Sequence, residues 1–230
     1  MAKKVAVILA GCGVYDGSEI YETTLTLLNL DKAGAQYQCF APNVDQAHVI
    51  DYTNGDVVEG EVRNVLKESA RLARGEIDDI KNANPTDFDA IVFPGGFGAA
   101  KNLSNFAFED DPEKLTVEPA VEAFVKKGFE AGVPFGFICI TPACVAAIAL
   151  RGRGLTLTVG KDEDTAAQIE ALGHTHQNAS AREMVRDPQF PVVSTPAYML
   201  GESLAEVEEG IGALVCEVLT LAENQQARSA

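Results

Sequence analysis

With 230 residues, the chain is long enough to build one sizeable hydrophobic core, and 47% hydrophobic with 23% charged residues is ordinary for a globular protein. Its net charge of −16 argues against nucleic acid or an anionic membrane surface as a partner, because both would be repelled. The five cysteines show no close metal-type pairing, which indicates reduced thiols and no zinc site. No secretory signal is recognisable, so we expect a cytoplasmic location.

Strand and helix patterns alternate along the chain, which predicts a single α/β domain with a doubly wound, mainly parallel sheet. Apolar runs predict strands over residues 5–9, 37–40, 87–93, 135–138, 155–159 and 191–194, with shorter strands over 174–178 and 184–186. Helical spacing predicts helices over residues 20–30, 61–74, 117–131, 143–150, 162–172 and 203–221. We expect the domain to cover residues 1–223, with an irregular acidic segment over 103–114 and a disordered tail over 224–230.

Two local signals concern the first third of the chain. Asn54-Gly55 lies between alternating segments within residues 48–58 and indicates a two-residue hairpin, a small antiparallel addition to the sheet. Asp16 and Ser18 are the candidate caps of the first helix, because their side-chain oxygens can accept an unpaired helical N–H.

Three predicted strands end in segments suited to a functional site. The first leads into the glycine-rich loop 10–17, the second into the glycine-rich segment 94–102, and the third into Cys139. Because the carboxyl ends of parallel strands lie at one edge of a sheet, we expect these three segments to meet in one crevice.

Residues 133–144 combine a short apolar strand, Cys139 and the start of a helix, and three interpretations are open. Residues 131–150 carry no charge, which approaches the length of a membrane span, although Pro134 and Gly136 argue against one. Cys139 is otherwise either an ordinary cysteine of the core or the side chain at a nucleophile elbow, a sharp strand-to-helix turn. At such an elbow, the first N–H groups of the helix would favour its thiolate.

Other residues near these strand ends are candidates for chemistry. Glu19 is either a general acid or base beside Cys139 or only an acid that the helix dipole favours. N–H groups near Gly95 and Gly96 are candidates for holding an oxyanion. Further pocket candidates are Ile140, Cys12, Lys101 and Asn102, and the candidate base is His176, close to His174. Lys101 is equally suited to a solvated surface, Cys12 to a structural role, and both histidines to an edge strand.

Four strings of residues together resemble one family. They are Gly11–Ile20, Pro94–Phe106, Gly136–Ala143 and Thr195–Met199, and the chain is similar to ElbB proteins over about residues 3–223. ElbB proteins are similar to the class I glutamine amidotransferase/PfpI superfamily, whose fold is flavodoxin-like. The resemblance implies a homodimer in which Cys139 matches the elbow nucleophile and Glu19 the carboxylate of the first helix.

The resemblance also implies an activity, because family members are described as cofactor-independent glyoxalases that convert glyoxal to glycolate and as proteins associated with isoprenoid biosynthesis. We therefore expect a small aldehyde as substrate and no cofactor. The expected reaction is addition of the Cys139 thiolate to glyoxal, with the oxyanion held near Gly95, Gly96 and Ile140, followed by proton transfer through Glu19 and hydrolysis of a thioester.

The sequence departs from two related patterns. Glutaminases usually have Gly-x-Cys-x-Gly and a downstream His-x-Glu pair, whereas here Cys139 is followed by Ile-Thr-Pro, and His176 by glutamine. PfpI-like peptidases have histidine directly after the nucleophile, where this chain has Ile140. Two alternatives to a glyoxalase stay open. One is a binding or regulatory protein with incidental turnover, and the other is an amidotransferase-like subunit that serves isoprenoid metabolism.

Overall fold

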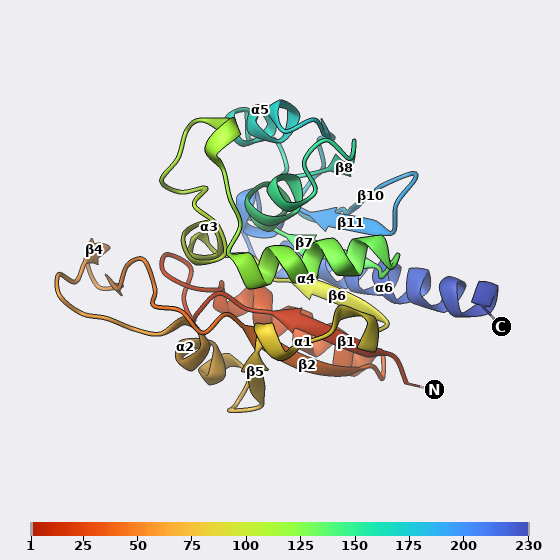
Figure 1. The fold of residues 1–230 in the computed structure, drawn as a ribbon, viewed down its shortest axis with the longest axis horizontal. Helices are drawn as coiled ribbons and strands as arrows, with labels where there is room; N and C mark the ends of the chain where they lie inside the picture. The colour runs from red at the N-terminus through yellow and green to blue at the C-terminus, as the bar shows by residue number, and fades with distance from the viewer. Residues whose placement is uncertain (1, 230) are drawn as a thin grey trace.

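A seven-stranded sheet divides the molecule into two helical layers (Figure 1), and the computed structural model describes residues 2–229. Its strand order is β10, β11, β7, β6, β1, β2, β5, and all neighbours are parallel except β10 and β11. The strands are β1 Lys4–Ile8, β2 Gln36–Ala41, β3 Ile50–Asp51, β4 Asp56–Val57, β5 Ile77–Asp79, β6 Ala90–Phe93, β7 Phe135–Ile138, β8 Thr156–Leu157, β9 Thr175–His176, β10 Val185–Arg186 and β11 Val192–Thr195. The predicted α/β fold with one mainly parallel sheet is confirmed.

Six α-helices and several short helical turns connect the strands of the described residues. The α-helices are α1 Ile20–Lys32, α2 Val65–Leu72, α3 Phe97–Asn102, α4 Pro119–Glu130, α5 Glu163–Ala171 and α6 Leu204–Ser229. The shorter turns are η1 Ile80–Asn82, η2 Pro85–Asp87, η3 Pro112–Lys114, the π-helix η4 Pro142–Ala147 and η5 Ala197–Met199. The segment 103–114 is irregular as expected, apart from η3.

The two faces of the central strand β7 explain the layers. Successive side chains of a strand point to opposite faces, so Phe135 contacts Gly128 of α4 while Gly136 lies against Leu214 of α6. Helices α1 and α6 pack against each other on the α6 face, and α4 covers the other face (Figure 1). A Cβ atom on Gly136 would come within 2.7 Å of the Leu214 side chain, so this strand needs glycine to let α6 approach.

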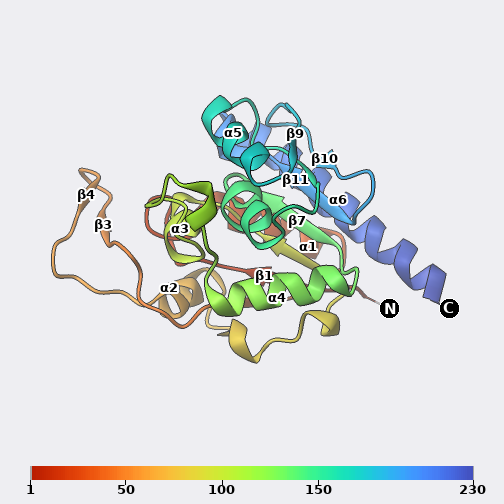
Figure 2. The ribbon, with the colours of Figure 1, turned by 45° about the horizontal axis from the view of Figure 1, so that its top comes forward.

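The predicted hairpin exists as β3 and β4, but it forms a separate two-stranded sheet instead of joining the main one. Its loop contains four residues, 52–55, and not two. The hairpin projects from the body of the molecule (Figure 2), and its contact is with the loop 10–17. There the carboxylate of Asp16 accepts the Ile50 N–H at 2.9 Å and the Tyr52 hydroxyl at 2.8 Å. This polar anchor places the hairpin away from any strand edge.

Several element boundaries differ from the predictions. Strand β5 was not predicted, because Ile77–Asp79 is a short and mostly polar edge strand. Helix α2 begins only at Val65, where the side chain of Asn64 accepts the Lys67 N–H and caps it. Helix α3 occupies the second half of the predicted loop 94–102. The expected strand 155–159 contains only β8, which pairs with β9 in a sheet of its own.

Helix α6 continues to Ser229, beyond the predicted helix end at residue 221, and Ala230 lies outside the described residues, while the domain bounds and the disordered tail from residue 224 stay predictions. The physical reason for the longer helix is that this stretch contains glutamate, glutamine, alanine and arginine, which favour helix, and has no glycine or proline to end it. Over residues 2–229, none of the helices has the length and apolar character needed to cross a membrane. Residues 131–150 contain strand β7 and the π-helix η4 and are not one continuous helix.

Candidate active site at the cysteine elbow

Cys139 occupies a sharp turn between β7 and the helix that follows. Its backbone has φ of +62°, a left-handed conformation that costs a residue with a side chain about 1–2 kcal/mol. Two contacts hold this turn. The Cys139 N–H donates to the Thr195 carbonyl of β11 at 2.9 Å, and the Thr141 hydroxyl accepts the Ile138 N–H at 2.9 Å. The nucleophile elbow predicted from the sequence is thus present as a geometry, although the helix after it begins as a π-helix and not as an α-helix.

The carboxyl group beside the Cys139 thiol belongs to Glu22, one turn further along α1 than the predicted Glu19. The Glu22 side chain is fully buried and hydrogen-bonded to the Cys139 sulfur. Its Oε2 accepts the Gly95 N–H at 3.0 Å, and its Oε1 accepts the Tyr198 N–H at 3.2 Å. Two segments distant in sequence, at Gly95 and at Tyr198, therefore hold this carboxyl group beside the thiol.

Glu19 has a different position and role in the structure. Its side chain is the N-cap of α1 and accepts the Glu22 N–H at 2.7 Å, while its own N–H donates to the Gly95 carbonyl at 2.9 Å. Glu19 therefore orients the turn that carries Glu22. The predicted caps serve elsewhere, because Asp16 anchors the hairpin and the Ser18 hydroxyl accepts the Ala10 N–H.

Burial dominates the acid–base properties of this pair. Desolvation, followed by the charge of Glu19, raises the pKa of Glu22 to about 8. Desolvation and the nearby Glu22 carboxylate also raise the pKa of Cys139 well above its ordinary value, outweighing the N–H groups of Gly96 and Ile140 that donate to the sulfur. The expectation that the helix N-terminus favours a thiolate is therefore wrong for the resting site. The thiol therefore keeps its proton, and the Glu22 carboxyl group can accept that proton only once it is itself ionised, above about pH 8.

The glycines at 95 and 96 allow the loops to approach the thiol closely. A Cβ atom on Gly95 would lie 2.4 Å from the Cys139 Cβ, and one on Gly96 would lie 2.4 Å from the Glu19 nitrogen. Because the Gly95 N–H is already bonded to Glu22, the N–H groups free to serve an oxyanion are those of Gly96 and Ile140. The predicted oxyanion donor at Gly95 instead holds the carboxyl group.

Asn102 is a structural residue and not a pocket residue. Its side-chain amide donates to the carbonyls of Ala10 and Asp16, both at 2.9 Å, and its oxygen accepts the Ala47 N–H at 3.0 Å. It joins the first glycine-rich loop to the segment that leads into the hairpin. No spacing pattern signals this role, because the three partners are backbone groups.

We expect Asn102→Ala to destabilise the fold by about 2–4 kcal/mol, because it leaves three buried or partly buried backbone groups without partners. Urea denaturation measures this change. Asn54→Ala, on the exposed hairpin loop, is the control and should cost less than about 1 kcal/mol. Equal stabilities of the two variants would contradict the role of Asn102.

Two further predicted pocket residues, Lys101 and Cys12, contact other groups. Lys101 lies over the Phe97 ring at 5.0 Å, and burial lowers its pKa. Cys12 forms an isolated bridge with Ser18, and burial raises its pKa. Neither residue is among the groups that act on Cys139 in the described structure.

The histidines are also used elsewhere. His174 accepts the Leu155 N–H at Nδ1 and donates from Nε2 to the Ala147 carbonyl, and His176 accepts the Val159 N–H. Burial lowers the pKa of both rings. Neither is among the groups that act on the thiol, so the prediction of His176 as a base receives no support from the described residues.

Sequence reasoning missed Glu22, and it assigned no role at the site to the segment 195–199, which it used only for the family resemblance. A signal for Glu22 was available, since it shares the buried face of α1 with Thr26 and Leu30, where an acid is unusual. Tyr198 contributes to the site through its backbone N–H, which donates to Glu22. The turn that directs this N–H contains Ala197 with φ of +43°, and no sequence pattern predicts that conformation.

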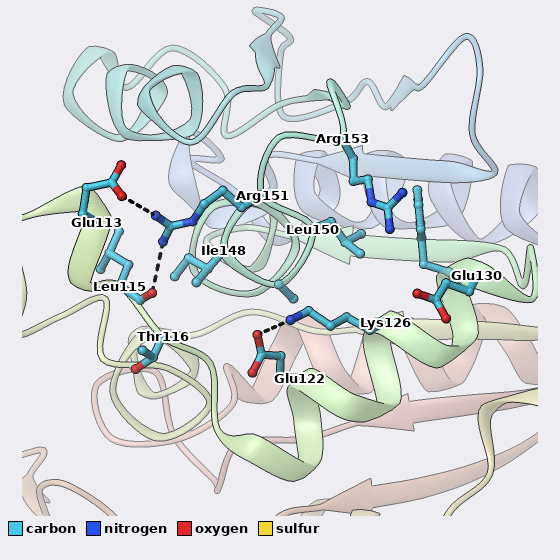
Figure 3. A pocket seen from close by; sticks show the side chains of 12 residues that line it. Glu113, Leu115, Thr116, Glu122, Lys126, Glu130, Ile148, Leu150, Arg151 and Arg153 are labelled. Carbon is cyan, nitrogen blue, oxygen red and sulfur yellow. Dashed lines mark hydrogen bonds and ion pairs between the residues drawn. The ribbon is translucent and has the colours of Figure 1, made fainter.

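A cavity of about 430 Å³ lies elsewhere, between α4 and residues 148–153 (Figure 3). Its charges compensate one another: Lys126 pairs with Glu122, and Arg151 lies near Glu113 and donates to the Leu115 carbonyl. Neither Cys139 nor Glu22 lines it, so it is not part of the thiol site. Among residues 2–229, no cluster of three or more His, Cys, Asp or Glu side chains is arranged to hold a metal ion.

The doubly wound sheet with a cysteine elbow at its carboxyl edge places the chain in a class of α/β folds that solved structures share. A DJ-1 superfamily protein from Salmonella typhimurium has the same fold, with a TM-score of 0.53, 23% identity and coverage of 98% of this chain and 91% of its own. No protein-family model matches the chain.

Two relatives are much more similar. The human mitochondrial glutamine amidotransferase-like class 1 domain-containing protein 3 is 46% identical over 229 residues, covering 96% of this chain and 84% of its own. An isoprenoid biosynthesis protein with amidotransferase-like domain from Ehrlichia chaffeensis is 38% identical, with a TM-score of 0.86 over 94% of this chain and 99% of its own. The chain therefore belongs to the ElbB-like family of class 1 glutamine amidotransferase-like proteins, as the sequence resemblance indicated.

Proposed function

We propose that the chain is a cofactor-independent glyoxalase that converts glyoxal, or a related small 2-oxoaldehyde, to the 2-hydroxy acid. The observation that supports this most is the Cys139 thiol hydrogen-bonded to the buried Glu22 carboxyl group, with the N–H groups of Gly96 and Ile140 at the sulfur. This set supplies a nucleophile, an acid–base group and an oxyanion site, which are the groups that the isomerisation of an aldehyde requires.

In the proposed reaction, ionised Glu22 takes the thiol proton as the Cys139 sulfur adds to one aldehyde carbon of glyoxal. The N–H groups of Gly96 and Ile140 hold the resulting oxyanion, which then receives the proton and gives a hemithioacetal. Glu22 next removes the hydrogen of that carbon, forming an enediol, and returns a proton to the second carbon. The product is a thioester of glycolate, which water hydrolyses to glycolate and free thiol. One water is consumed per glyoxal, and no external oxidant or reductant is needed.

The direct experiment measures glycolate from glyoxal in buffer without glutathione and with a chelator present. We expect turnover, and in D₂O we expect deuterium on the hydroxymethyl carbon of glycolate, because the enediol takes its proton from an exchangeable carboxyl group. Absence of glycolate would overturn the proposed function. Turnover without deuterium incorporation would replace the enediol step by a direct hydride shift.

The raised pKa of Glu22 predicts the pH dependence of the reaction. Below about pH 8, the carboxyl group holds its proton and cannot accept that of the thiol. We therefore expect kcat/KM for glyoxal to rise from about pH 6 to about pH 9, with a midpoint near the Glu22 pKa of about 8. Stopped assays of glycolate across this range test it, and a flat profile would exclude Glu22 as the base.

Glutamine hydrolysis is less well supported, even though the human relative is named amidotransferase-like. Breaking an amide requires protonation of the leaving amine, usually by histidine, and His174 and His176 are bonded to backbone groups of other segments. A binding or regulatory role remains the alternative that the glycolate assay decides. The homodimer and the cytoplasmic location stay predictions, and for the location the human relative is named as mitochondrial.

A further inference from the structure

The Cys139 sulfur is enclosed on most sides. The cysteine is only 7% exposed, Ile140 is 6% exposed, and Glu22 and Thr141 are fully buried. A substrate must therefore reach the thiol past neighbours that are themselves accessible, and the identity of these neighbours decides what can enter.

Two accessible tyrosines lie beside Glu22. Tyr21 directly precedes Glu22 on α1 and is 55% exposed. Tyr198 is half-buried and comes shortly after Thr195, the residue of β11 whose carbonyl accepts the Cys139 N–H. The ring centroids are 6.4 Å apart with the planes at 52°. Tyr198 is tied to the site through its own N–H, which donates to Glu22 Oε1.

The Tyr198 phenol also lies close enough to both carboxyl groups of α1 to respond to them. Burial, and then the charges of Glu19 and Glu22, raise the pKa of this phenol. The Tyr198 side chain therefore lies within electrostatic reach of Glu22, and its backbone N–H is bonded to the same carboxyl group. Tyrosine rings are rigid and bulky, so two of them at this distance restrict the width of an opening.

We propose that Tyr21 and Tyr198 form the entrance to Cys139 and act as specificity-determining residues that admit small aliphatic 2-oxoaldehydes and exclude bulky aryl ones. This inference rests on the proposed function for its substrate class. The entrance itself is a property of access to the thiol and can be tested without turnover.

The kinetic test compares kcat/KM for glyoxal and phenylglyoxal in the wild type, Tyr21→Ala and Tyr198→Ala. We expect the ratio of phenylglyoxal to glyoxal to rise about tenfold or more in Tyr198→Ala, since steric discrimination of this kind is worth about 10–200-fold. Tyr198→Phe keeps the ring and should keep the wild-type ratio. Tyr37→Ala is the matched control. Tyr37 is 43% exposed and lies near the start of β2, at the amino ends of the parallel strands, whereas Cys139 lies at their carboxyl ends. Unchanged ratios in both alanine variants at the entrance would overturn the proposal.

A second test uses thiol alkylation followed by mass spectrometry of the peptides. The reagents are iodoacetamide and a fluorescein-linked iodoacetamide, and the exposed Cys216 is an internal standard in the same molecule. We expect the bulky reagent to label Cys139 much more slowly than Cys216 in the wild type, and the alanine variants to reduce this difference about tenfold. Size-independent labelling of Cys139 would overturn the entrance. A size effect in a protein that turns over no aldehyde would instead overturn the proposed function and leave the entrance standing.

Discussion

Cys139→Ala is expected to abolish glycolate formation from glyoxal, with a loss in kcat of at least about a thousandfold. The reason is that the alanine removes the only atom that bonds to the aldehyde carbon, so the hemithioacetal and thioester cannot form. The readout is glycolate by NMR or coupled assay, with the fold checked by circular dichroism.

The control for this variant is Cys216→Ala, which removes an exposed thiol on α6 and should leave activity unchanged. Because Cys139 has φ of +62°, Cys139→Gly is a second variant that relieves the strained backbone and should be equally inactive. Equal low rates in the wild type and Cys139→Ala would identify background chemistry and favour a binding protein.

Glu22→Gln is expected to lower kcat/KM about 10²–10⁴-fold, because the amide can neither take the thiol proton nor move a proton between the two carbons. The amide oxygen can still accept one of the two N–H groups, of Gly95 and Tyr198, that hold Glu22, so we expect the variant to fold. Its residual activity should lose the pH dependence that the wild type shows near pH 8.

Glu19→Gln is the matched comparison, because it changes the same residue type one turn earlier on α1. Its amide oxygen can still cap the Glu22 N–H, so activity should fall less than about tenfold. Removing the charge of Glu19 also takes away one cause of the raised Glu22 pKa, so the pH midpoint should move down. A larger loss in Glu19→Gln than in Glu22→Gln would restore the original assignment of Glu19.

The elbow was predictable from the sequence because its signals are local. A short apolar run, a cysteine and a helix-forming string define where the strand ends and what lies at its end. The parallel sheet then follows from alternation, and the meeting of the loops at one edge follows from the parallel sheet. The membership of the ElbB-like family was likewise visible in four strings of residues.

The partner of the thiol was not predictable with the same certainty, because Glu19 and Glu22 are one turn apart on the same helix. Helical spacing places both near the elbow, and only the direction of each side chain decides between them. The strength of burial was also missed. The N–H groups near the start of the helix do lower the pKa of Cys139 as expected, but desolvation raises this pKa by more. Desolvation depends on tertiary packing, which no local sequence motif specifies.

The dependence of the site on β11 has a consequence for how the protein is made. The carbonyl of Thr195 that holds the elbow and the N–H of Tyr198 that holds Glu22 leave the ribosome long after the segments that they organise. During synthesis, Cys139 and Glu22 are already available while their arrangement is not, because β11 and α6 have yet to dock. Chains interrupted before residue 195 would carry both reactive side chains without the geometry that pairs them, so the chemistry of the site is acquired only in the last stage of translation.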